Sequence, residues 1–415
     1  MAQMIQDLFY SLGNCLNCFP GSPTLKINGR SFKILRLLGE GGFSYVYLVE
    51  DTATSETLAL KKIRCPFGAE SLATAMREVE AYRIFAHTPG IIHMVDYSVA
   101  ADSGGGVGGI GGDGDGGSKT VYVLLPYYKR GNLQDVINAN VVNSARFPER
   151  KLMELFLGVC KALRRMHVYE AGPARMERME MGDGDTAGGR RVASTRAAVP
   201  DVEEETEQER PLMQGENNVA GAHIKAYAHR DIKPGNIMIN DTGEGPILMD
   251  LGSVVPSPTP ITSHSLAIAT QDQAAEHSTM PYRAPELFDV RTGTVIDTKV
   301  DIWSMGCTLF ACLIGKSPFE MRSDETGGTL SLCVLGGDWR FPDEAPGGGA
   351  VRDKPRRTGT GTTAPEARAP EVRISDPVRA VVRKCLAVEP SERPDIDELI
   401  EMVKGVIEGL PEDEA

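Results

Sequence analysis

The spacing of apolar residues in the N-terminal half of the chain predicts a small sheet. Three short apolar runs, at 32–38, 46–49 and 57–63, follow one another closely, with a glycine-rich turn between the first two. A further run at 121–125 is apolar throughout, which is typical of a buried strand. We therefore expect at least these four strands.

Two other stretches have helical spacing. Residues 71–86 place apolar side chains three and four positions apart, which predicts a helix with one buried stripe. The stripe consists of Leu72, Ala75, Met76, Val79 and Tyr82. Residues 1–19 show the same spacing and predict an amphipathic helix that ends at Cys15 and Cys18. Another helix is expected to end near His167.

Three segments rich in glycine, proline or charge interrupt this pattern, at 102–118, 172–220 and 343–373. They contain few large apolar residues, so burial there cannot offset the conformational entropy of the chain. We expect three disordered insertions in one domain at 27–408, preceded by the 1–26 segment and followed by an acidic tail at 409–415.

Composition narrows the class of protein. The chain has 415 residues and a formal net charge of −13, which argues against nucleic acid as a partner. Its eight cysteines show no disulfide framework, as expected for reduced thiols. No apolar run approaches the roughly 20 residues of a membrane-spanning helix. We expect a monomer with neither a transmembrane segment nor a signal peptide.

Candidate chemistry lies at 229–236, which reads His-Arg-Asp-Ile-Lys-Pro-Gly-Asn. The motifs Asp250-Leu-Gly and Ala284-Pro-Glu follow in that order. Phosphoryl transfer needs a carboxylate beside the attacking hydroxyl, ligands for Mg²⁺ and a cation on the phosphates. The ordered motifs resemble those of eukaryotic protein kinases. The resemblance implies an α+β fold of two lobes, a small β-rich lobe and a large, mainly helical lobe.

The resemblance also implies roles for the residues of these motifs. Asp231 is expected to be the catalytic base, and Lys233 to stabilise the γ-phosphate of ATP. Asn236 and Asp250 are expected to hold Mg²⁺. Lys233 together with Thr279 is typical of kinases that phosphorylate serine and threonine on protein substrates, although dual specificity stays open.

The glycine-rich turn is expected to cover the phosphates of ATP. Its glycines let the backbone approach the phosphates without an intervening Cβ, and Ser44 stands where the common pattern has its last glycine. The expected ATP contacts in this turn are Gly39, Glu40, Gly41, Gly42, Phe43, Ser44 and Val46.

Ala59-Leu60-Lys61 resembles the kinase motif whose lysine contacts the α- and β-phosphates. Glu78 on the predicted helix is the expected partner of Lys61. Two alternatives are Lys62, which points to the opposite face of the strand, and Glu80, which lies on a different face of the helix.

The run at 121–125 leads into the expected adenine site. By resemblance, Leu125 is the gatekeeper, and Pro126, Tyr127 and Tyr128 form the hinge. Pro126 has no amide hydrogen, so adenine must bind other backbone groups of the hinge.

Two structural contacts are implied in the large lobe. Asp301, at the start of a buried helix with Trp303, is expected to brace the backbone of the catalytic loop. Glu286 and Arg393 are expected to form a buried ion pair.

Several details resemble the numb-associated kinase family, and within it the branch anchored by myristoyl and palmitoyl chains. They include Leu251 in place of the usual phenylalanine and the sequence Tyr-Arg-Ala-Pro-Glu-Leu-Phe at 282–288. That family has an extra helix between the metal-binding motif and Ala284-Pro-Glu, which 271–276 is expected to begin.

The same branch suggests palmitoylation at Cys15 and Cys18, with peripheral association at the cytoplasmic face of an internal membrane, vacuole or Golgi. Ala2 departs from the branch, because myristoylation needs glycine after the initiator Met. A packing helix and a zinc site at the two cysteines are the alternatives. For the whole chain, the alternative function is a pseudokinase scaffold. The sequence argues against this alternative, because every residue expected to contact phosphate, bind metal or act as the base is present.

Overall fold

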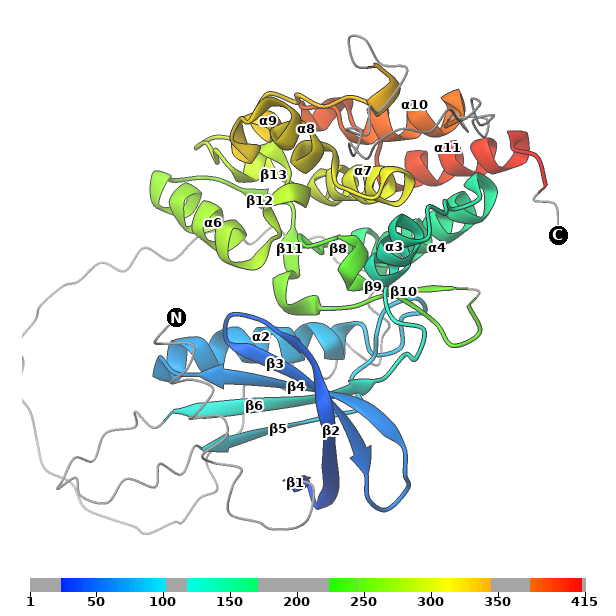
Figure 1. Cartoon of the computed structure of the whole chain (residues 1–415). Coiled ribbons are helices and arrows are strands. Elements are labelled where there is room, and N and C mark those ends of the chain that lie inside the picture. Colours follow the sequence, from blue (N-terminus) through cyan, green and yellow to red (C-terminus); the bar gives the residue numbers. More distant parts are fainter. Residues whose placement is uncertain (1–23, 102–117, 171–223, 244, 345–373, 413–415) are drawn as a thin grey trace, which may run out of the picture. The chain divides into compact units, whose positions relative to one another are not determined.

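The computed structural model describes residues 24–101, 118–170, 224–243, 245–344 and 374–412 (Figure 1). They form a β-rich N-terminal lobe and a helical C-terminal lobe, the α+β fold predicted from the sequence. Cys15, Cys18 and the greater part of the three expected insertions lie outside the described residues.

The N-terminal lobe is an antiparallel sheet of six strands in the order β1-β2-β3-β4-β6-β5. The strands are β1 (Thr24–Ile27), β2 (Arg30–Glu40), β3 (Ser44–Asp51), β4 (Thr57–Cys65), β5 (Asp96–Ala101) and β6 (Lys119–Pro126). Phe32, Val49, Leu58, Leu60 and Leu124 form the core of this lobe and are at most 1% exposed. Because successive side chains in a strand alternate between faces, the burial of Leu60 in this core places the next residue on the opposite face.

Two elements of the N-terminal lobe differ from the sequence-based expectation. Strand β1 begins three residues before the expected boundary at 27 and pairs with β2 through a turn at Asn28 and Gly29, both with positive φ. Helix α2 (Gly68–Ile84) begins and ends earlier than the predicted 71–86. Its stripe is buried at Ala75, Val79 and Tyr82, as expected, and it packs against β4 and β6.

The C-terminal lobe is built around α7, whose residues from Val300 to Cys312 are all buried. Its helices are α3 (Leu133–Val142), α4 (Glu149–His167), α6 (His264–His277), α7 (Lys299–Ile314), α8 (Pro318–Thr326), α9 (Leu330–Leu335), α10 (Asp376–Cys385) and α11 (Ile396–Gly409). Helix α10 packs on α7, and α11 packs along α4. The indole of Trp303 stacks on Phe319 with ring centroids 5.2 Å apart.

Short strands and single helical turns shape the loops of this lobe. The strands are β7 (Tyr169–Glu170), β8 (Ile224–Ala228), β9 (Ile237–Ile239), β10 (Pro246–Leu248), β11 (Val255–Ser257), β12 (Thr259–Pro260) and β13 (Val295–Ile296). The 3₁₀ turns are η2 (Pro234–Asn236), η3 (Leu251–Ser253), η4 (Met280–Tyr282), η5 (Pro285–Leu287), η6 (Pro342–Glu344) and η7 (Pro390–Glu392). Within the separate unit 169–225, the described residues are those where β7 pairs with the beginning of β8.

Two expectations for the C-terminal lobe need correction. The extra helix does not begin within 271–276, because α6 starts at His264, where the Ser263 side chain caps the N–H of Leu266. Asp343 and Glu344 were assigned to an insertion, but they form η6 and pair with Arg379 at 2.6 and 3.3 Å. Among the described helices, none is both long and apolar enough to cross a bilayer.

Candidate active site

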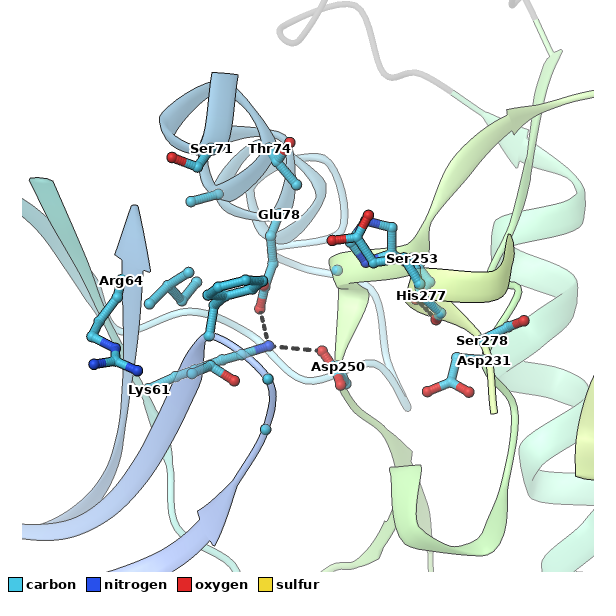
Figure 2. A pocket seen from close by; sticks show the side chains of 18 of the residues that line it. Lys61, Arg64, Ser71, Thr74, Glu78, Asp231, Asp250, Ser253, His277 and Ser278 are labelled. Atoms are coloured by element: carbon cyan, nitrogen blue, oxygen red, sulfur yellow. Dashed lines mark hydrogen bonds and ion pairs between the residues drawn. The ribbon is translucent and has the colours of Figure 1, made fainter. Parts of the chain in front are cut away.

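A cavity of about 640 Å³ lies beside β4, α2 and the loops that follow β8 and β10 (Figure 2). It is lined by the predicted site residues Lys61, Glu78, Asp231, Lys233 and Asp250. The structure therefore brings together residues that lie as much as 189 positions apart in the chain.

Lys61 lines this cavity and forms two ion pairs. Its Nζ lies 2.7 Å from Glu78 Oε1 and 2.9 Å from Asp250 Oδ1. Burial by itself would lower the pKa of Lys61, but the charges of Asp250 and Glu78 outweigh this effect and raise the pKa well above its ordinary value. Lys61 is thus a fixed cation between α2 and the Asp250 loop.

The alternatives to this pair are excluded by geometry. Glu80 is exposed on α2 and interacts with Arg83 at 3.4 Å. Lys62 follows Lys61 in β4, so its side chain leaves the opposite face of the sheet. The structure thus contains the pair that the resemblance to kinases implied, Lys61 with Glu78, and neither alternative.

Tyr82 also contacts Glu78. The sequence analysis placed Tyr82 on the buried stripe of the helix but did not predict this contact. Its hydroxyl donates to Glu78 Oε1 at 3.1 Å, and its side chain is 1% exposed. Burial raises the pKa of Glu78 although Lys61 opposes the shift. The signal was available, because Tyr82 lies one helical turn after Glu78 on the buried stripe.

Asp250 projects into the cavity from a left-handed backbone conformation with φ of 61°. The Lys61 ammonium lowers the pKa of Asp250 to about 2, so this carboxylate is ionised at neutral pH. Asn236 lies in η2 and donates from Nδ2 to the backbone and side-chain oxygens of Asp231, at 2.9 and 2.8 Å. Both of these hydrogen bonds use Nδ2 of the Asn236 amide as the donor.

These oxygen atoms match the ligand preference of Mg²⁺, which usually binds one or two carboxylates together with substrate phosphates. No group of three or more His, Cys, Asp or Glu side chains in the described part of the chain is arranged to hold a metal. The carboxylate of Asp250 and the amide of Asn236 are of the oxygen-ligand type that Mg²⁺ accepts together with substrate phosphates.

The carboxylate of Asp231 is held by Lys233 and Thr279 in addition to Asn236. Lys233 Nζ lies 2.8 Å from Asp231 Oδ2. Thr279 donates to Asp231 Oδ1 from its backbone N–H at 2.9 Å and from its hydroxyl at 2.7 Å. Lys233 Nζ also donates to Thr279 Oγ1 at 2.6 Å, which closes a triangle around the carboxylate.

Asp301 braces the catalytic loop as expected. The backbone N–H groups of His229 and Arg230 each donate to its carboxylate at 2.7 Å. His167 Nε2 also lies 2.9 Å from Asp301, a contact that the sequence analysis did not predict. Burial opposes ionisation of Asp301, but hydrogen bonding and charge from His167 outweigh it and lower the pKa. Arg230 has φ of 65°, so this brace supports an unusual backbone conformation.

The expected ion pair behind the site is also present. Arg393 donates from two nitrogens to the two oxygens of Glu286, at 2.6 and 2.8 Å. Its side chain is fully buried and lies 5.0 Å from the ring centre of Trp303. This pair joins η5, which contains Glu286, to the residue that follows η7.

The other residues expected to contact ATP lie in the sheet or directly after it. Gly39 pairs with Val46 across β2 and β3, and Ala59 pairs with Leu125 across β4 and β6. Pro126 ends β6, and Tyr127 and Tyr128 follow it; Glu40 ends β2. None of these eight residues lines the 640 Å³ cavity, which reaches only the tip of the turn, at Gly41, Gly42, Phe43 and Ser44.

An aromatic contact at the tip of the turn was not predicted. The ring of Phe43 meets the ring of Phe67 edge to face, with centroids 5.7 Å apart. Phe67 precedes α2, so the contact links the turn to that helix.

Comparison with known proteins agrees with this geometry. A sequence profile of the protein kinase domain matches residues 32–171 and 205–403. Serine/threonine-protein kinase ENV7 of Saccharomyces cerevisiae is 31% identical over 415 residues, which cover 97% of this chain and 99% of the yeast protein.

Two other relatives match over shorter alignments. Serine/threonine-protein kinase ppk13 of Schizosaccharomyces pombe is 30% identical over 377 residues, or 91% of each chain. Human serine/threonine-protein kinase 16 is 30% identical over 323 residues, which cover 78% of this chain and 82% of the human protein. The chain therefore belongs to the protein kinase family, among the serine/threonine protein kinases with which it aligns over most of its length.

Proposed function

We propose that this protein transfers the γ-phosphoryl group of ATP to serine and threonine hydroxyls of protein substrates. The observation that carries the proposal is the arrangement around Asp231, whose carboxylate is fixed by Lys233, Asn236 and Thr279 within the same cavity as Lys61 and Asp250. Phosphoryl transfer depends mainly on positioning and electrostatic stabilisation, and this cavity provides both.

Asp231 is the proposed catalytic base. Its carboxylate faces the cavity and accepts the proton of the substrate hydroxyl as that oxygen attacks phosphorus. The hydrogen bonds from Thr279 and Asn236 fix the carboxylate, so that little reorganisation is needed during the reaction.

Lys61 and Lys233 are the proposed phosphate contacts. Glu78 holds the Lys61 ammonium in the cavity, and Lys61 then binds the α- and β-phosphates. Lys233 lies on the Asp231 side, where it stabilises the transferred γ-phosphate. Asp250 and Asn236 are the proposed Mg²⁺ ligands. Bound Mg²⁺ supplies positive charge that neutralises the β- and γ-phosphate oxygens.

The remaining predicted ATP residues complete the proposed site. The turn from Gly39 to Val46 covers the phosphates, and Ala59 and Leu125, paired across adjacent strands, pack against adenine. Backbone groups of the hinge at 126–128 bind the adenine edge.

Specificity for serine and threonine is supported by the contact of Lys233 with both Asp231 and Thr279. The test uses purified full-length chain, labelled ATP, Mg²⁺ and three peptides that differ only in a Ser, Thr or Tyr acceptor. Phosphorylation of the first two peptides and its loss on chelation of Mg²⁺ are expected. Efficient phosphorylation of the Tyr peptide would contradict the specificity, and absence of transfer to all three would favour the pseudokinase scaffold.

We also propose that the chain belongs to the lipid-anchored branch of the numb-associated kinases and is acylated at Cys15 and Cys18. The support is the helical spacing of apolar residues over 1–19 together with the two cysteines at its end. One acyl chain gives marginal binding, so two chains, or one chain with the apolar face, are needed for stable association with an internal membrane such as the vacuole or Golgi.

Thiol-directed acyl exchange and cell fractionation test this anchor. Cys15→Ser with Cys18→Ser is expected to move the protein to the cytosol and to leave its activity in solution unchanged. Cys65→Ser is the control, because the thiol of Cys65 is buried in the N-terminal lobe. Unlabelled thiols at 15 and 18, or a double variant that stays on membranes, would contradict the anchor.

A further inference from the structure

Serine hydroxyl groups donate hydrogen bonds to carbonyls at the C-terminal end of α6. The last carbonyls of a helix have no partner inside the helix. Ser253 Oγ, from η3, donates to the carbonyl of His277 at 2.5 Å. Ser278, which directly follows α6, donates from its hydroxyl to the carbonyl of Ala274 at 2.6 Å. The Ala274 carbonyl also accepts from the Ser278 backbone N–H at 3.0 Å, whereas the His277 carbonyl accepts from the Ser253 hydroxyl.

Arg283 holds the same end of the helix from the other side. Its Nε donates to Ser278 Oγ at 2.7 Å, and its Nη2 donates to the carbonyls of Ser278 at 3.0 Å and Ala275 at 3.4 Å. The residue is 7% exposed, and its guanidinium lies 4.9 Å from the ring centre of Phe288. A cation is favourable at a helix C-terminus, and the planar guanidinium reaches several acceptors in a fixed geometry.

Thr279 lies directly beside these contacts. It follows Ser278 in the chain, and both its N–H and its hydroxyl hold Asp231 Oδ1. Ser253 belongs to the loop that begins with Asp250. Figure 2 shows the Ser253 side chain next to His277, with Ser278 close by. The contacts thus connect the loop of the proposed metal ligand to the residue that holds the proposed base.

Burial of apolar side chains contributes little to holding α6 in place. Its buried residues are Ala267, Thr270 and Ala274, whose small side chains remove little apolar area from water. The chain from 251 to 282 contains no lysine or arginine, so this segment brings no such cation for an ion pair. Ser253 and Arg283 are side chains from outside α6 that hydrogen bond directly to its C-terminal end.

We infer that Ser253 and Arg283 are positioning residues for phosphoryl transfer, which fix Thr279 and, through it, the carboxylate of Asp231. The inference rests on the proposed kinase function. Both residues act through the end of α6, so their loss changes the placement of the base and leaves nucleotide binding at Lys61 intact.

The test compares Ser253→Ala, Ser253→Thr and Arg283→Lys in the full-length chain. Ser253→Ala removes the hydroxyl, and Ser253→Thr retains it. Arg283→Lys keeps the positive charge but loses the planar guanidinium with its several hydrogen-bond donors. Ser265→Ala is the matched control, because Ser265 is an exposed hydroxyl in the first turn of the same helix. The readouts are kcat, the KM for ATP, and amide hydrogen exchange over 264–279.

Ser253→Ala and Arg283→Lys are expected to lower kcat by about ten- to a hundredfold, the scale at which misplaced catalytic groups slow a reaction. They should leave the KM for ATP unchanged and speed exchange at 274–279. Ser253→Thr should restore kcat, and Ser265→Ala should match the wild type. Unchanged kcat in both variants, or lowered kcat with unchanged exchange, would overturn the inference. If the wild type itself transfers no phosphate, the proposed kinase function is wrong. If the wild type is active but hydrogen exchange at 274–279 is unchanged in the variants, only the role of Ser253 and Arg283 at the end of α6 is refuted.

Discussion

The ammonium group of Lys61 lies 2.7 Å from Glu78 Oε1, which ties β4 to α2. The same ammonium lies 2.9 Å from Asp250, so one cation holds carboxylates from the helix and from the loop after β10. Because all three groups line the cavity, the position of α2 is coupled to the proposed phosphate and metal sites.

Lys61→Ala is expected to abolish phosphoryl transfer, because both carboxylates lose their cation and the α- and β-phosphates lose their contact. Lys62→Ala is the matched control and should retain activity, since its side chain lies on the other face of β4. Initial rates at saturating ATP, measured for both variants and the wild type, test this prediction. Loss of activity in the control alone would mean that the functional face of the strand is the other one.

Tyr82→Phe removes the hydroxyl that donates to Glu78 and keeps the buried ring. We expect the free energy of unfolding to fall by about 1–2 kcal/mol, the usual effect of removing one hydrogen bond from a buried group. Urea denaturation measures the change. Tyr97→Phe removes a hydroxyl that accepts from Arg83 at the surface and should cost less. Equal losses in the two variants would argue against a special role for the Tyr82 hydroxyl.

Glu286→Gln leaves the fully buried Arg393 without its carboxylate. Breaking a buried ion pair on one side usually costs about 3–5 kcal/mol. Thermal and urea unfolding should show a loss of this order. Asp289→Asn is the control, because its partner Arg291 is exposed, and exposed pairs contribute about 0–1 kcal/mol. A loss in Glu286→Gln no larger than in the control would contradict a supporting role for the buried pair.

Stability at acid pH should depend on Asp250. Its pKa falls from 3.8 in the unfolded chain to about 2 in the folded protein, chiefly because of Lys61. A depressed carboxyl pKa stabilises the fold above 3.8, and this contribution is lost as the pH falls toward about 2. We expect the stability difference between wild type and Asp250→Asn, measured by urea unfolding, to shrink over this window. A constant difference would mean that the pKa of Asp250 is not depressed.

The parts of the site that the sequence predicted rest on short-range regularities. The resemblance to kinases implied the pair of Lys61 and Glu78, and strand alternation and helix spacing told against Lys62 and Glu80, whose side chains lie on other faces. Asp231, Lys233 and Asn236 lie within one short loop, so their proximity follows from their spacing. The fold class followed in turn from motifs that resemble a known family.

Other features depend on contacts between distant segments. His167 and Asp301 are 134 residues apart, and no local pattern joins them. Helix α6 was placed too late because its buried stripe is made of small residues, which give a weak periodic signal. Its start depends on the cap at Ser263, and its end on side chains outside the helix.

Asp231→Asn tests the central claim most directly. The substitution is nearly isosteric, so the fold and ATP binding should persist, but the amide cannot take the proton of the substrate hydroxyl. We expect kcat to fall by about 10²- to 10⁴-fold, the usual contribution of a general base, with an unchanged dissociation constant for ATP. Near wild-type kcat in a folded Asp231→Asn protein that binds ATP normally would contradict the assignment of Asp231 as the base.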